Sequence, residues 1–420
     1  MQFNSKEVLL LQALHFLDSP TRNEIARYTG LSAVSVTSLL NQLLGAGAIQ
    51  RVGKASSRGG RPSALYRVSP DFGFTVGISV ESSAFRIVAI DSGMEILEER
   101  RYALALSSQP EDHLTEIVRQ VSTELERLLT AESLAARRLL ALGIAPPGMV
   151  DTAKGVWLHG LQVSGIAHID LRNLLERTFA VPVIAEDPAR CLAWRERARA
   201  GGRAAEPLVL LYLSDGVGAG IVIDGGLYRG VNGLAGEIGH LHVADDGDRC
   251  PCGNIGCLEM VVSEPSILRR FRRRLGEGVI SVLQCFAADG LDLWRILEAA
   301  KADDRLARST LYDLGLVLGD ACAALVELYN PRTLFLGGPV GALWEFFRDP
   351  VLLRMRQRVI PEMLVDLRID SAPYERHDEA MGAAMIAEHY FWQRLDPSAA
   401  RLRGPTRAAQ AISGKEVDKG

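Results

Sequence analysis

The first part of the chain has a hydrophobic pattern that predicts three helices. The first helix covers the apolar run of residues 8–17 and stops before a proline, which cannot continue a helix. Thr21 and Glu24 have the spacing of a capping box that opens the second helix. Ser32 caps the third helix, which we expect to run to about Leu44. Three helices alone are compatible with either a protein-docking module or a DNA-binding module.

The third predicted helix has one apolar face and one polar face. Leucines and a valine recur at helical spacing on the side that we expect to be buried. The opposite face carries small hydrogen-bonding side chains, which can enter a major groove without steric conflict. These polar side chains are Ser35, Thr37, Ser38, Asn41 and Gln42.

A hairpin with a long, glycine-rich tip is predicted after the third helix. Its strands are expected at residues 49–52 and 66–68, and its tip contains Arg58 and Arg61. Arginines on such a tip can reach phosphates or a narrow minor groove. The alternative is a solvated loop beside a trihelical docking module, but the hairpin, the positive charge and the polar third helix together favour a winged helix-turn-helix. The candidate DNA-binding residues are Ser35, Thr37, Ser38, Asn41, Arg58 and Arg61.

From residue 74 onward, strand patterns alternate with helix patterns. Asp224-Gly225 is a turn signal between two of the predicted strands. Two similar halves, each beginning with a hairpin, indicate two α/β lobes with a cleft between them. Strands are predicted at residues 74–80, 84–90, 139–145, 208–213, 218–223 and 333–336, and helices at residues 111–129, 171–179 and 305–329.

Composition and charge narrow the class of protein. A chain of 420 residues with 48% apolar content should fold as two or three globular domains. Residues 1–70 have a charge balance of +5, so the remainder must sum to −9 to give the net charge of −4. A basic head on an acidic body suggests that the head meets a polyanion. No secretory leader opens the sequence and no apolar run approaches a membrane span, so we expect a cytoplasmic protein with no membrane partner.

A cluster of cysteines lies beside one histidine. Cys250, Cys252 and Cys257 fall within eight residues, and His240 precedes them by ten positions. A proline and a glycine inside the cluster favour tight turns that would bring the three sulfurs together. Three loop cysteines beside a core histidine are the alternative, but in a cytosolic protein such clusters more often bind metal than form disulfides. We therefore predict a closed, structural zinc site with these four ligands.

Several motifs occur together in the body: Gly143 to Asp151, Gly216 to Gly220, Gly233 to His240, Cys250 to Glu259, and Asn330-Pro331 leading to Gly337-Gly338. Together they resemble the ROK family of sugar kinases and sugar-responsive repressors, over residues 72–392. The head, with Gly59-Gly60-Arg61-Pro62, resembles the winged helix of the repressor branch. The resemblance implies an actin-like two-lobed fold, a zinc loop and a monosaccharide in the cleft.

The resemblance also implies four sugar-binding residues: Asp187, Glu237, His240 and Glu259. His240 would bind zinc through one ring nitrogen and the sugar through the other, because the metal fixes the tautomer of the ring. From the residues alone, Glu237 and Glu259 could equally be surface carboxylates beside a metal loop. This chain has Glu186 where the family has asparagine, and we expect the additional carboxylate to make the pocket more acidic.

The first phosphate loop of the family kinases is not preserved. They have Asp-x-Gly-x-Thr where this chain has Ser79-Val80-Glu81-Ser82-Ser83. Ser79 lacks the charge to bind a metal ion, and Glu81 places a negative charge where a triphosphate would lie. Two unit charges about 4 Å apart repel by roughly 4 kcal/mol at an effective dielectric near 20. An inherited turn explains the glycines of residues 216–220. Asp187 stands where the family kinases have their base, but its presence shows only that a hydroxyl can be bound. We therefore predict that the chain is not an enzyme.

These features predict a DNA-binding transcriptional regulator, a repressor released from operator DNA by a monosaccharide bound between the lobes. We expect a homodimer or a tetramer. The alternatives are an ATP-dependent sugar kinase with an appended DNA-binding domain and a zinc-stabilised docking protein without a small ligand. The predicted divisions are a winged helix at 1–70, a first lobe at 72–186, a second lobe with the zinc loop at 187–376, a C-terminal helix at 377–394 and a disordered tail at 395–420.

Overall fold

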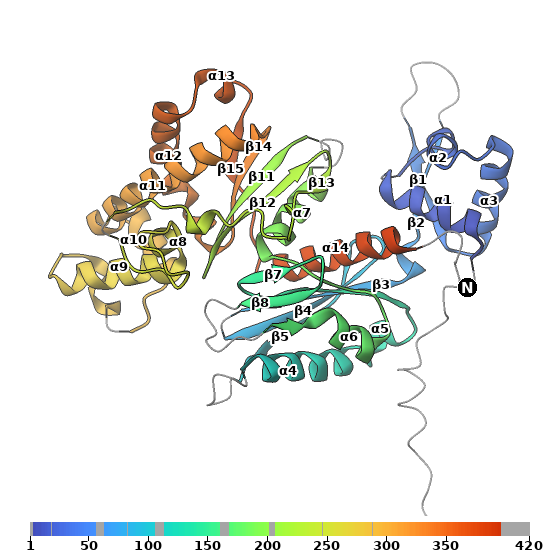
Figure 1. Cartoon of the computed structure of the whole chain (residues 1–420), viewed down its shortest axis with the longest axis horizontal. Coiled ribbons are helices and arrows are strands. Elements are labelled where there is room, and N and C mark those ends of the chain that lie inside the picture. The colour runs from blue at the N-terminus through green and yellow to red at the C-terminus, as the bar shows by residue number, and fades with distance from the viewer. Residues whose placement is uncertain are drawn as a thin grey trace, which may run out of the picture.

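The computed structural model describes residues 3–395 except 18, 56–62, 82, 106–112, 160–167, 201–205, 246 and 288. An N-terminal head stands beside a body of two α/β lobes (Figure 1). Each lobe is built on one five-stranded sheet, and two helices lie between the sheets.

The head contains the predicted three helices and hairpin. Thr21 and Glu24 form the predicted capping box, and the hydroxyl of Ser32 accepts a hydrogen bond from the Ser35 N–H. Val36 and Leu40 are buried on the inner face of the third helix. The elements are α1 (Ser5–Phe16), α2 (Arg22–Thr29), α3 (Ala33–Gly45), β1 (Ile49–Lys54) and β2 (Ala64–Val68), followed by the short helix η1 (Pro70–Phe72).

The first lobe is a mixed sheet with strand order β10-β6-β3-β4-β5. Its central strands β3, β4 and β6 are buried along their whole length, as the continuous apolar runs predict. The strands are β3 (Phe74–Val80), β4 (Ala84–Asp91), β5 (Ile96–Ala103), β6 (Leu139–Ala145) and β10 (Val183–Ala185). The helices α4 (His113–Leu128), α5 (Glu132–Ala135) and α6 (Leu171–Phe179) and a small sheet of β7 (Met149–Asp151), β8 (Val156–His159) and β9 (Ile169–Asp170) complete it.

The second lobe repeats this arrangement with strand order β13-β12-β11-β14-β15. In both sheets the leading strand pairs antiparallel with its hairpin partner on one side and parallel with a later strand on the other. The strands are β11 (Leu208–Leu213), β12 (Val217–Ile223), β13 (Gly226–Leu227), β14 (Thr333–Gly337) and β15 (Arg368–Ser371). The helices are η4 (Ile238–His240), α8 (Glu259–Val262), α9 (Glu264–Gly276), η5 (Val282–Phe286), α10 (Leu293–Lys301), α11 (Arg305–Tyr329), η6 (Pro339–Leu343), α12 (Trp344–Arg358) and α13 (Pro361–Leu364).

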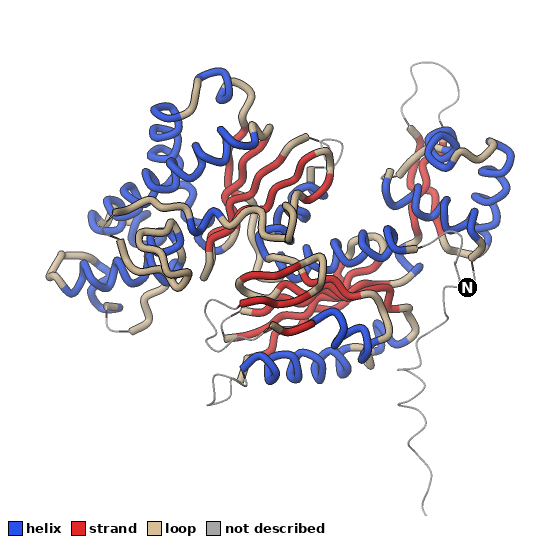
Figure 2. The backbone as a smooth tube through the Cα atoms, viewed as in Figure 1, coloured by secondary structure: helices blue, strands red, loops and turns tan. Residues whose placement is uncertain are grey.

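Two helices connect the lobes. Helix α7 (Pro188–Arg199) packs on β11 and β12, and α14 (Asp378–Arg394) packs on β3, β6 and α7. Figure 2 shows α14 along the upper face of the first-lobe sheet, with the head beyond one end. Both lobes are therefore joined through this pair of helices.

The predicted fold class, a winged helix-turn-helix followed by a two-lobed α/β body, is confirmed. Strand β5 was not predicted, because its sequence contains two glutamates and two arginines and it lies at the edge of the sheet. The short strands β7, β8, β9, β10, β13 and β15 were also missed. Among the described residues, no helix combines the length and the apolar character that crossing a membrane requires.

Candidate functional site

A cavity of about 110 Å³ lies between the two lobes. The turn after β3 contributes Glu81, the start of α7 contributes Asp187, and β11 contributes Tyr212. Segments before η4 and at the start of α8 contribute Glu237 and Glu259. The cavity can hold several water-sized groups and hence a small polar ligand. Three of the four predicted sugar-binding residues therefore line one cavity.

Asp187 is held in place by the helix that it begins. One oxygen of its carboxylate accepts hydrogen bonds from the N–H groups of Ala189, at 2.8 Å, and Arg190, at 3.2 Å. This is the N-cap geometry expected for aspartate before a proline at the first helical position. Burial raises the pKa of Asp187, although nearby Arg190 opposes the shift. The second carboxylate oxygen remains available to a ligand.

Glu237 is positioned by a segment that lies directly on β12. Gly236 has φ +99°, and a Cβ atom there would overlap the carbonyl oxygen of Ala219. The Ala219 N–H also donates to the carbonyl of Gly236, at 2.7 Å. Burial raises the pKa of Glu237 to about 7, and the negative charge of Asp187 adds to this shift. Glycine at 236 therefore allows the backbone approach that presents Glu237 to the cavity.

Glu259 lies two residues after Cys257, at the end of the cysteine loop. It is the first residue of α8, and its Oε2 atom accepts a hydrogen bond from the Val217 N–H at 3.1 Å. Its side chain is buried, and burial raises its pKa. Glu237, Glu259 and Asp187 thus present acceptor oxygens in a partly desolvated space. Such a site suits a ligand with several hydroxyl groups and disfavours an anion.

The expectation that Glu186 makes the pocket more acidic is wrong. Its side chain is 0% exposed and does not line the cavity. Its carboxylate oxygens accept hydrogen bonds from Arg190 Nε at 2.6 Å and Arg229 Nε at 2.7 Å. Burial alone would raise the pKa of Glu186, but the two guanidinium groups hold it below its ordinary value. The negative charge is therefore neutralised behind the cavity wall, by arginines that the sequence pattern did not connect to it.

The predicted metal ligands lie together. The ligand atoms of His240, Cys250, Cys252 and Cys257 are all within 4.8 Å of one another, so the cluster could hold a metal ion. Cys250 Sγ is 3.7 Å from His240 Nδ1, and Cys252 Sγ is 3.7 Å from Cys257 Sγ. The other ring nitrogen of His240 is 3.9 Å from Glu237 Oε2. His240 therefore joins the cluster to the carboxylates of the cavity.

Local turns explain how the cysteine segment closes. The Cys250 N–H donates to the carbonyl of Asn254 at 2.8 Å, and Gly253 adopts φ +100° between them. An antiparallel bridge joins His242 to Cys257. The predicted convergence of three sulfurs through a glycine turn is confirmed.

The side of the cavity near β3 carries the negative charge of Glu81. The Ser79 hydroxyl is buried and has no hydrogen-bond partner within the described part of the chain. Glu81 lines the cavity, and its carboxylate is 3.9 Å from Arg86 Nε. The interpretation of residues 216–220 as one turn needs correction, because Gly218 and Gly220 lie within β12. A Cβ atom at Gly220 would overlap the Ala189 carbonyl, so packing against α7 accounts for that glycine without nucleotide.

Of the four predicted DNA-binding residues on α3, two are exposed and two are half-buried. Ser38 and Asn41 are exposed on α3, whereas Thr37 is half-buried and donates to the Ala33 carbonyl at 2.7 Å. Ser35 is also half-buried, with its hydroxyl 2.9 Å from that of Ser32. Val34 is 81% exposed at helical spacing from Ser38 and Asn41, and was missed because it is apolar. Gln42, also assigned to the polar face, donates to Glu7, and Arg58 and Arg61 lie outside the described residues.

The fold and the cavity define a two-lobed, sugar-kinase-type α/β body that carries a winged helix-turn-helix. The model of the ROK family matches residues 75–390, and the chain belongs to this family. The resemblance inferred from the sequence motifs is thereby confirmed.

Two curated relatives and one solved structure that resemble this chain over most of its length are regulators. The chain is 30% identical to the DNA-binding transcriptional dual regulator NagC of Escherichia coli over 323 residues, covering 76% of this chain and 77% of NagC. It is 26% identical over 368 residues to a xylose repressor of Caldicellulosiruptor bescii, covering 87% of this chain and 91% of that protein. The crystal structure of a ROK family transcriptional regulator, a homologue of Escherichia coli Mlc, matches with a TM-score of 0.76 at 22% identity, covering 94% and 98% of the two chains.

Proposed function

We propose that this chain is a sugar-responsive transcriptional repressor whose body senses a monosaccharide and does not phosphorylate it. The observation that carries the proposal is the composition of one cavity, which has carboxylates for hydroxyl groups and an additional carboxylate, Glu81, at the expected triphosphate position. The names of the relatives support a regulator over a kinase, and the match to the xylose repressor covers 87% of this chain. Regulation of transcription would place the protein in the cytoplasm.

Zinc is the metal that best suits the cysteine and histidine cluster. A tetrahedral zinc ion places two sulfur ligands about 3.8 Å apart, and a sulfur and a nitrogen ligand about 3.6 Å apart. The two 3.7 Å separations in the cluster agree with these values. Three cysteines and one histidine complete the coordination, so no position is left for a reactive water. The ion would supply structure, because it would fix the loop from which Glu259 extends.

The sugar would bind to Asp187, Glu237, His240 and Glu259. The carboxylates would accept hydrogen bonds from neighbouring hydroxyl groups. With Nδ1 of His240 facing the metal cluster, Nε2 faces Glu237 and the cavity side. Metal binding through Nδ1 of the neutral ring would leave the proton on Nε2, so Nε2 would donate a hydrogen bond. The metal and the sugar would therefore share one ligand residue.

Helix α3 would enter the major groove of operator DNA. Val34, Ser38 and Asn41 lie on one exposed face, where a valine can contact a thymine methyl group and an asparagine can contact adenine. Arg58 and Arg61 on the hairpin tip would add contacts to phosphate or to the minor groove. A palindromic operator would require a symmetric dimer with heads about 34–36 Å apart.

Sugar binding would release the operator by changing the closure of the two lobes and thereby the position of the heads. By thermodynamic linkage, operator DNA must then reduce the affinity for the sugar by the same factor. The test is a titration of D-xylose, D-glucose and N-acetylglucosamine into the protein by calorimetry, with and without a DNA duplex selected by the protein from a random library. Equal sugar affinities with and without DNA contradict the proposal, and so does sustained phosphorylation of any of the sugars by ATP.

A further inference from the structure

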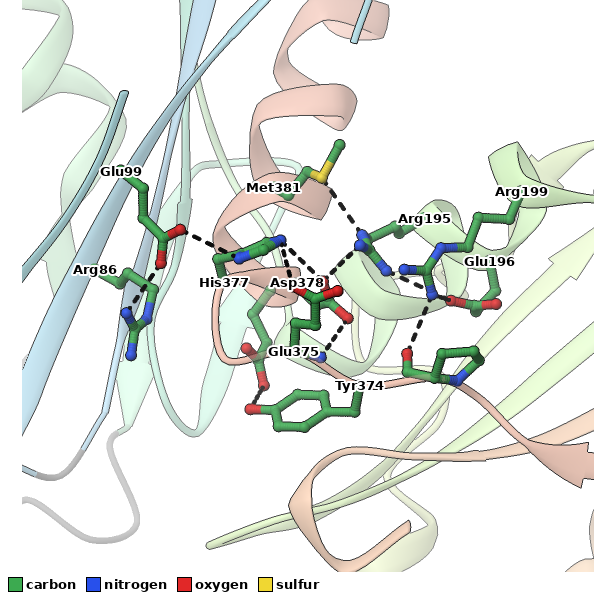
Figure 3. Close-up of polar contacts among 12 residues, drawn as sticks. Arg86, Glu99, Arg195, Glu196, Arg199, Tyr374, Glu375, His377, Asp378 and Met381 are labelled. Carbon is green, nitrogen blue, oxygen red and sulfur yellow. Dashed lines mark hydrogen bonds and ion pairs between the residues drawn. The ribbon is translucent and has the colours of Figure 1, made fainter. Parts of the chain in front are cut away.

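The first turn of α14 is the centre of a buried polar network (Figure 3). Asp378 is buried, and its Oδ1 atom is 2.7 Å from Arg195 Nη2 on α7. Its Oδ2 atom accepts a hydrogen bond from the Glu375 N–H at 2.9 Å. Because Asp187 caps α7, the helix that positions one predicted sugar ligand is also fixed to the start of α14.

A second contact joins the cavity wall directly to α14. Tyr212, on β11 of the second lobe, lines the cavity and donates its hydroxyl to Glu379 Oε1 at 3.0 Å. Tyr374 donates to the same oxygen at 3.1 Å but does not line the cavity. Glu379 is buried, so removing either donor takes a hydrogen bond from a carboxyl group that water does not readily reach.

A third series of contacts begins at the opposite cavity wall. Glu81 is 3.9 Å from Arg86 Nε, and Arg86 Nη1 donates to Glu99 Oε1 at 3.2 Å. The other oxygen of Glu99 is 3.3 Å from Nδ1 of His377, the residue that precedes α14. Figure 3 shows Arg86, Glu99 and His377 in this order on one side of Asp378, with Arg195 on the other side. Both walls of the cavity therefore reach the same turn of α14.

The middle of α14 is packed too closely to bend independently of the body. A Cβ atom at Gly77 on β3 would overlap the carbonyl oxygen of Ala380, and one at Gly143 on β6 would overlap that of Ala383. Backbone thus lies against backbone along the helix. A 17-residue helix spans about 25 Å, so α14 can act as a rigid connection over that distance.

The far end of α14 holds the head. Nε2 of Gln12 on α1 donates to the carbonyl oxygens of Trp392 and Leu395, each at 2.8 Å. These bonds satisfy carbonyl groups that the end of a helix leaves without intrahelical partners. His15 Nε2 also lies 3.4 Å from His389 Nδ1. A crevice of about 670 Å³ beside this contact is lined by the end of α1, by α14 and by the turn between β12 and β13, so both the head and the second lobe border it.

We propose that α14 couples the sugar cavity to the head, with Tyr212–Glu379 as the contact that responds to the sugar and Gln12 as the contact that holds the head. This inference rests on the proposed function. Closure of the lobes around a sugar would move β11 relative to the first-lobe strands that support α14. The hydrogen bond of Tyr212 to the buried Glu379 would then shift the first turn of α14, and the rigid helix would change the seating of α1 at its other end.

The test measures a coupling factor, defined as the ratio of DNA affinities without and with saturating sugar. The sugar is whichever of D-xylose, D-glucose and N-acetylglucosamine binds the full chain. The DNA is the library-selected duplex. Couplings in allosteric proteins are typically about 5- to 150-fold. In Tyr212→Phe and in Gln12→Leu we expect this factor to fall to within about twofold of one, as expected for loss of the linking contact. The sugar affinity of each variant is measured first, so that the sugar is saturating for each.

Two matched variants serve as controls. Tyr374→Phe removes the other donor to Glu379 without altering the cavity wall, and Gln42→Leu removes a head glutamine that bonds within the head to Glu7. Both should retain the wild-type coupling factor. Spin labels on the head and the first lobe should show a sugar-dependent change of distance in the wild type and none in Tyr212→Phe. Wild-type coupling in Tyr212→Phe or Gln12→Leu overturns the role of α14, whereas a coupling factor of one in the wild type with every sugar contradicts the proposed function itself.

Discussion

The two sides of the interlobe cavity differ in chemistry although they share one small space. On the second-lobe side, Glu237 and Glu259 present acceptors beside a cluster that could hold a metal ion. On the side of the turn after β3, Ser79 is buried and without a hydrogen-bond partner in the described structure, and Glu81 adds a negative charge. One side is suited to hydroxyl groups and the other opposes phosphates. Sugar recognition and phosphoryl transfer are therefore separable in this fold.

The difference follows from what each ligand group requires. A hydroxyl group needs an acceptor oxygen and gains from a desolvated carboxylate. A triphosphate needs backbone N–H groups, cations and a metal-binding acid. Replacing a glycine by a glutamate removes close backbone approach and adds repulsion, while the hydroxyl-binding side is unchanged. A sensor can thus retain the binding side of an enzyme's cleft without its catalytic side.

The largest predicted effect comes from breaking the metal cluster. Cys252→Ser should release the metal, disorder residues 245–260 and abolish sugar binding, because Glu259 extends from the end of this loop. Structural zinc sites contribute about 10 kcal/mol or more to folding of their loops. The measurements are metal content by mass spectrometry and sugar affinity by calorimetry. Cys285→Ser is the control, because Cys285 is exposed and outside the cluster.

A metal-free Cys252→Ser chain that binds sugar as the wild type does would show that the two functions of His240 are independent. DNA binding by the head should persist in this variant, since Leu11 and Leu40 of the head belong to a core shared with the first lobe and α14 and not with the cysteine loop.

The next effect is a pH dependence from the first turn of α14. Burial raises the pKa of Glu379 to about 7 from its ordinary 4.5, and the charge of Glu81 adds to the shift. In the unfolded chain this carboxyl group loses its proton near pH 4.5, whereas in the folded protein it keeps the proton up to about pH 7. The contribution of Glu379 to the free energy of unfolding therefore falls as the pH rises from 4.5 to about 7 and is constant above. Glu379→Gln should remove a decrease on the order of 3 kcal/mol, measured by urea unfolding at each pH.

Glu388 provides a comparison on the same helix, because burial also raises its pKa to about 7. Glu388→Gln should remove a similar decrease, and the double variant should remove both. If Glu379→Gln leaves the pH profile of the wild type unchanged, the carboxyl group behind Tyr212 is not neutral in the folded protein.

A smaller effect is expected from the sugar side. Asp187→Asn retains an oxygen that can cap α7, so the fold should be preserved. It removes the negative charge that would accept a sugar hydroxyl, and charged hydrogen bonds contribute about 1.5–3 kcal/mol. We expect sugar affinity to fall by about 10- to 100-fold, with DNA affinity unchanged when no sugar is present. Unchanged sugar affinity would exclude Asp187 from the binding site.

Much of this arrangement was predictable because it is encoded locally. Continuous apolar runs predicted β3 and β6, and the capping box at Thr21 and Glu24 predicted the start of α2. The family, the fold class and the choice of a regulator over a kinase are confirmed by the comparisons. The roles of individual sugar-binding and DNA-binding residues, and the domain boundaries, stay predictions.

The unpredicted features depend on contacts between distant segments. Glu186 looked like a pocket acid because its partner Arg229 is 43 positions away. The link between Gln12 and Trp392 joins residues 380 positions apart, and no local pattern indicates it. In α9, five arginines conceal the helical spacing of the buried residues Ile267 and Phe271. Pairing of buried charges is a property of the tertiary structure.

The smallest effect is expected when residue 81 of the degenerate phosphate loop is partly restored to the sequence of the family kinases. Glu81→Gly returns the glycine of the family kinases, and Glu81→Gln removes the charge but keeps the bulk. Glu81 is 38% exposed, so solvent screens its repulsion of a phosphate, and the gain in affinity for the ATP analogue AMPPNP should be about 1 kcal/mol, or roughly fivefold. If charge dominates, both variants gain AMPPNP affinity equally; if backbone approach dominates, only Glu81→Gly gains.

Neither variant should phosphorylate a sugar, because Ser79 still lacks the acid that would hold a metal ion. Calorimetry with AMPPNP and a coupled ATP assay provide the measurements, and wild-type AMPPNP affinity equal to that of both variants would show that Glu81 does not oppose nucleotide.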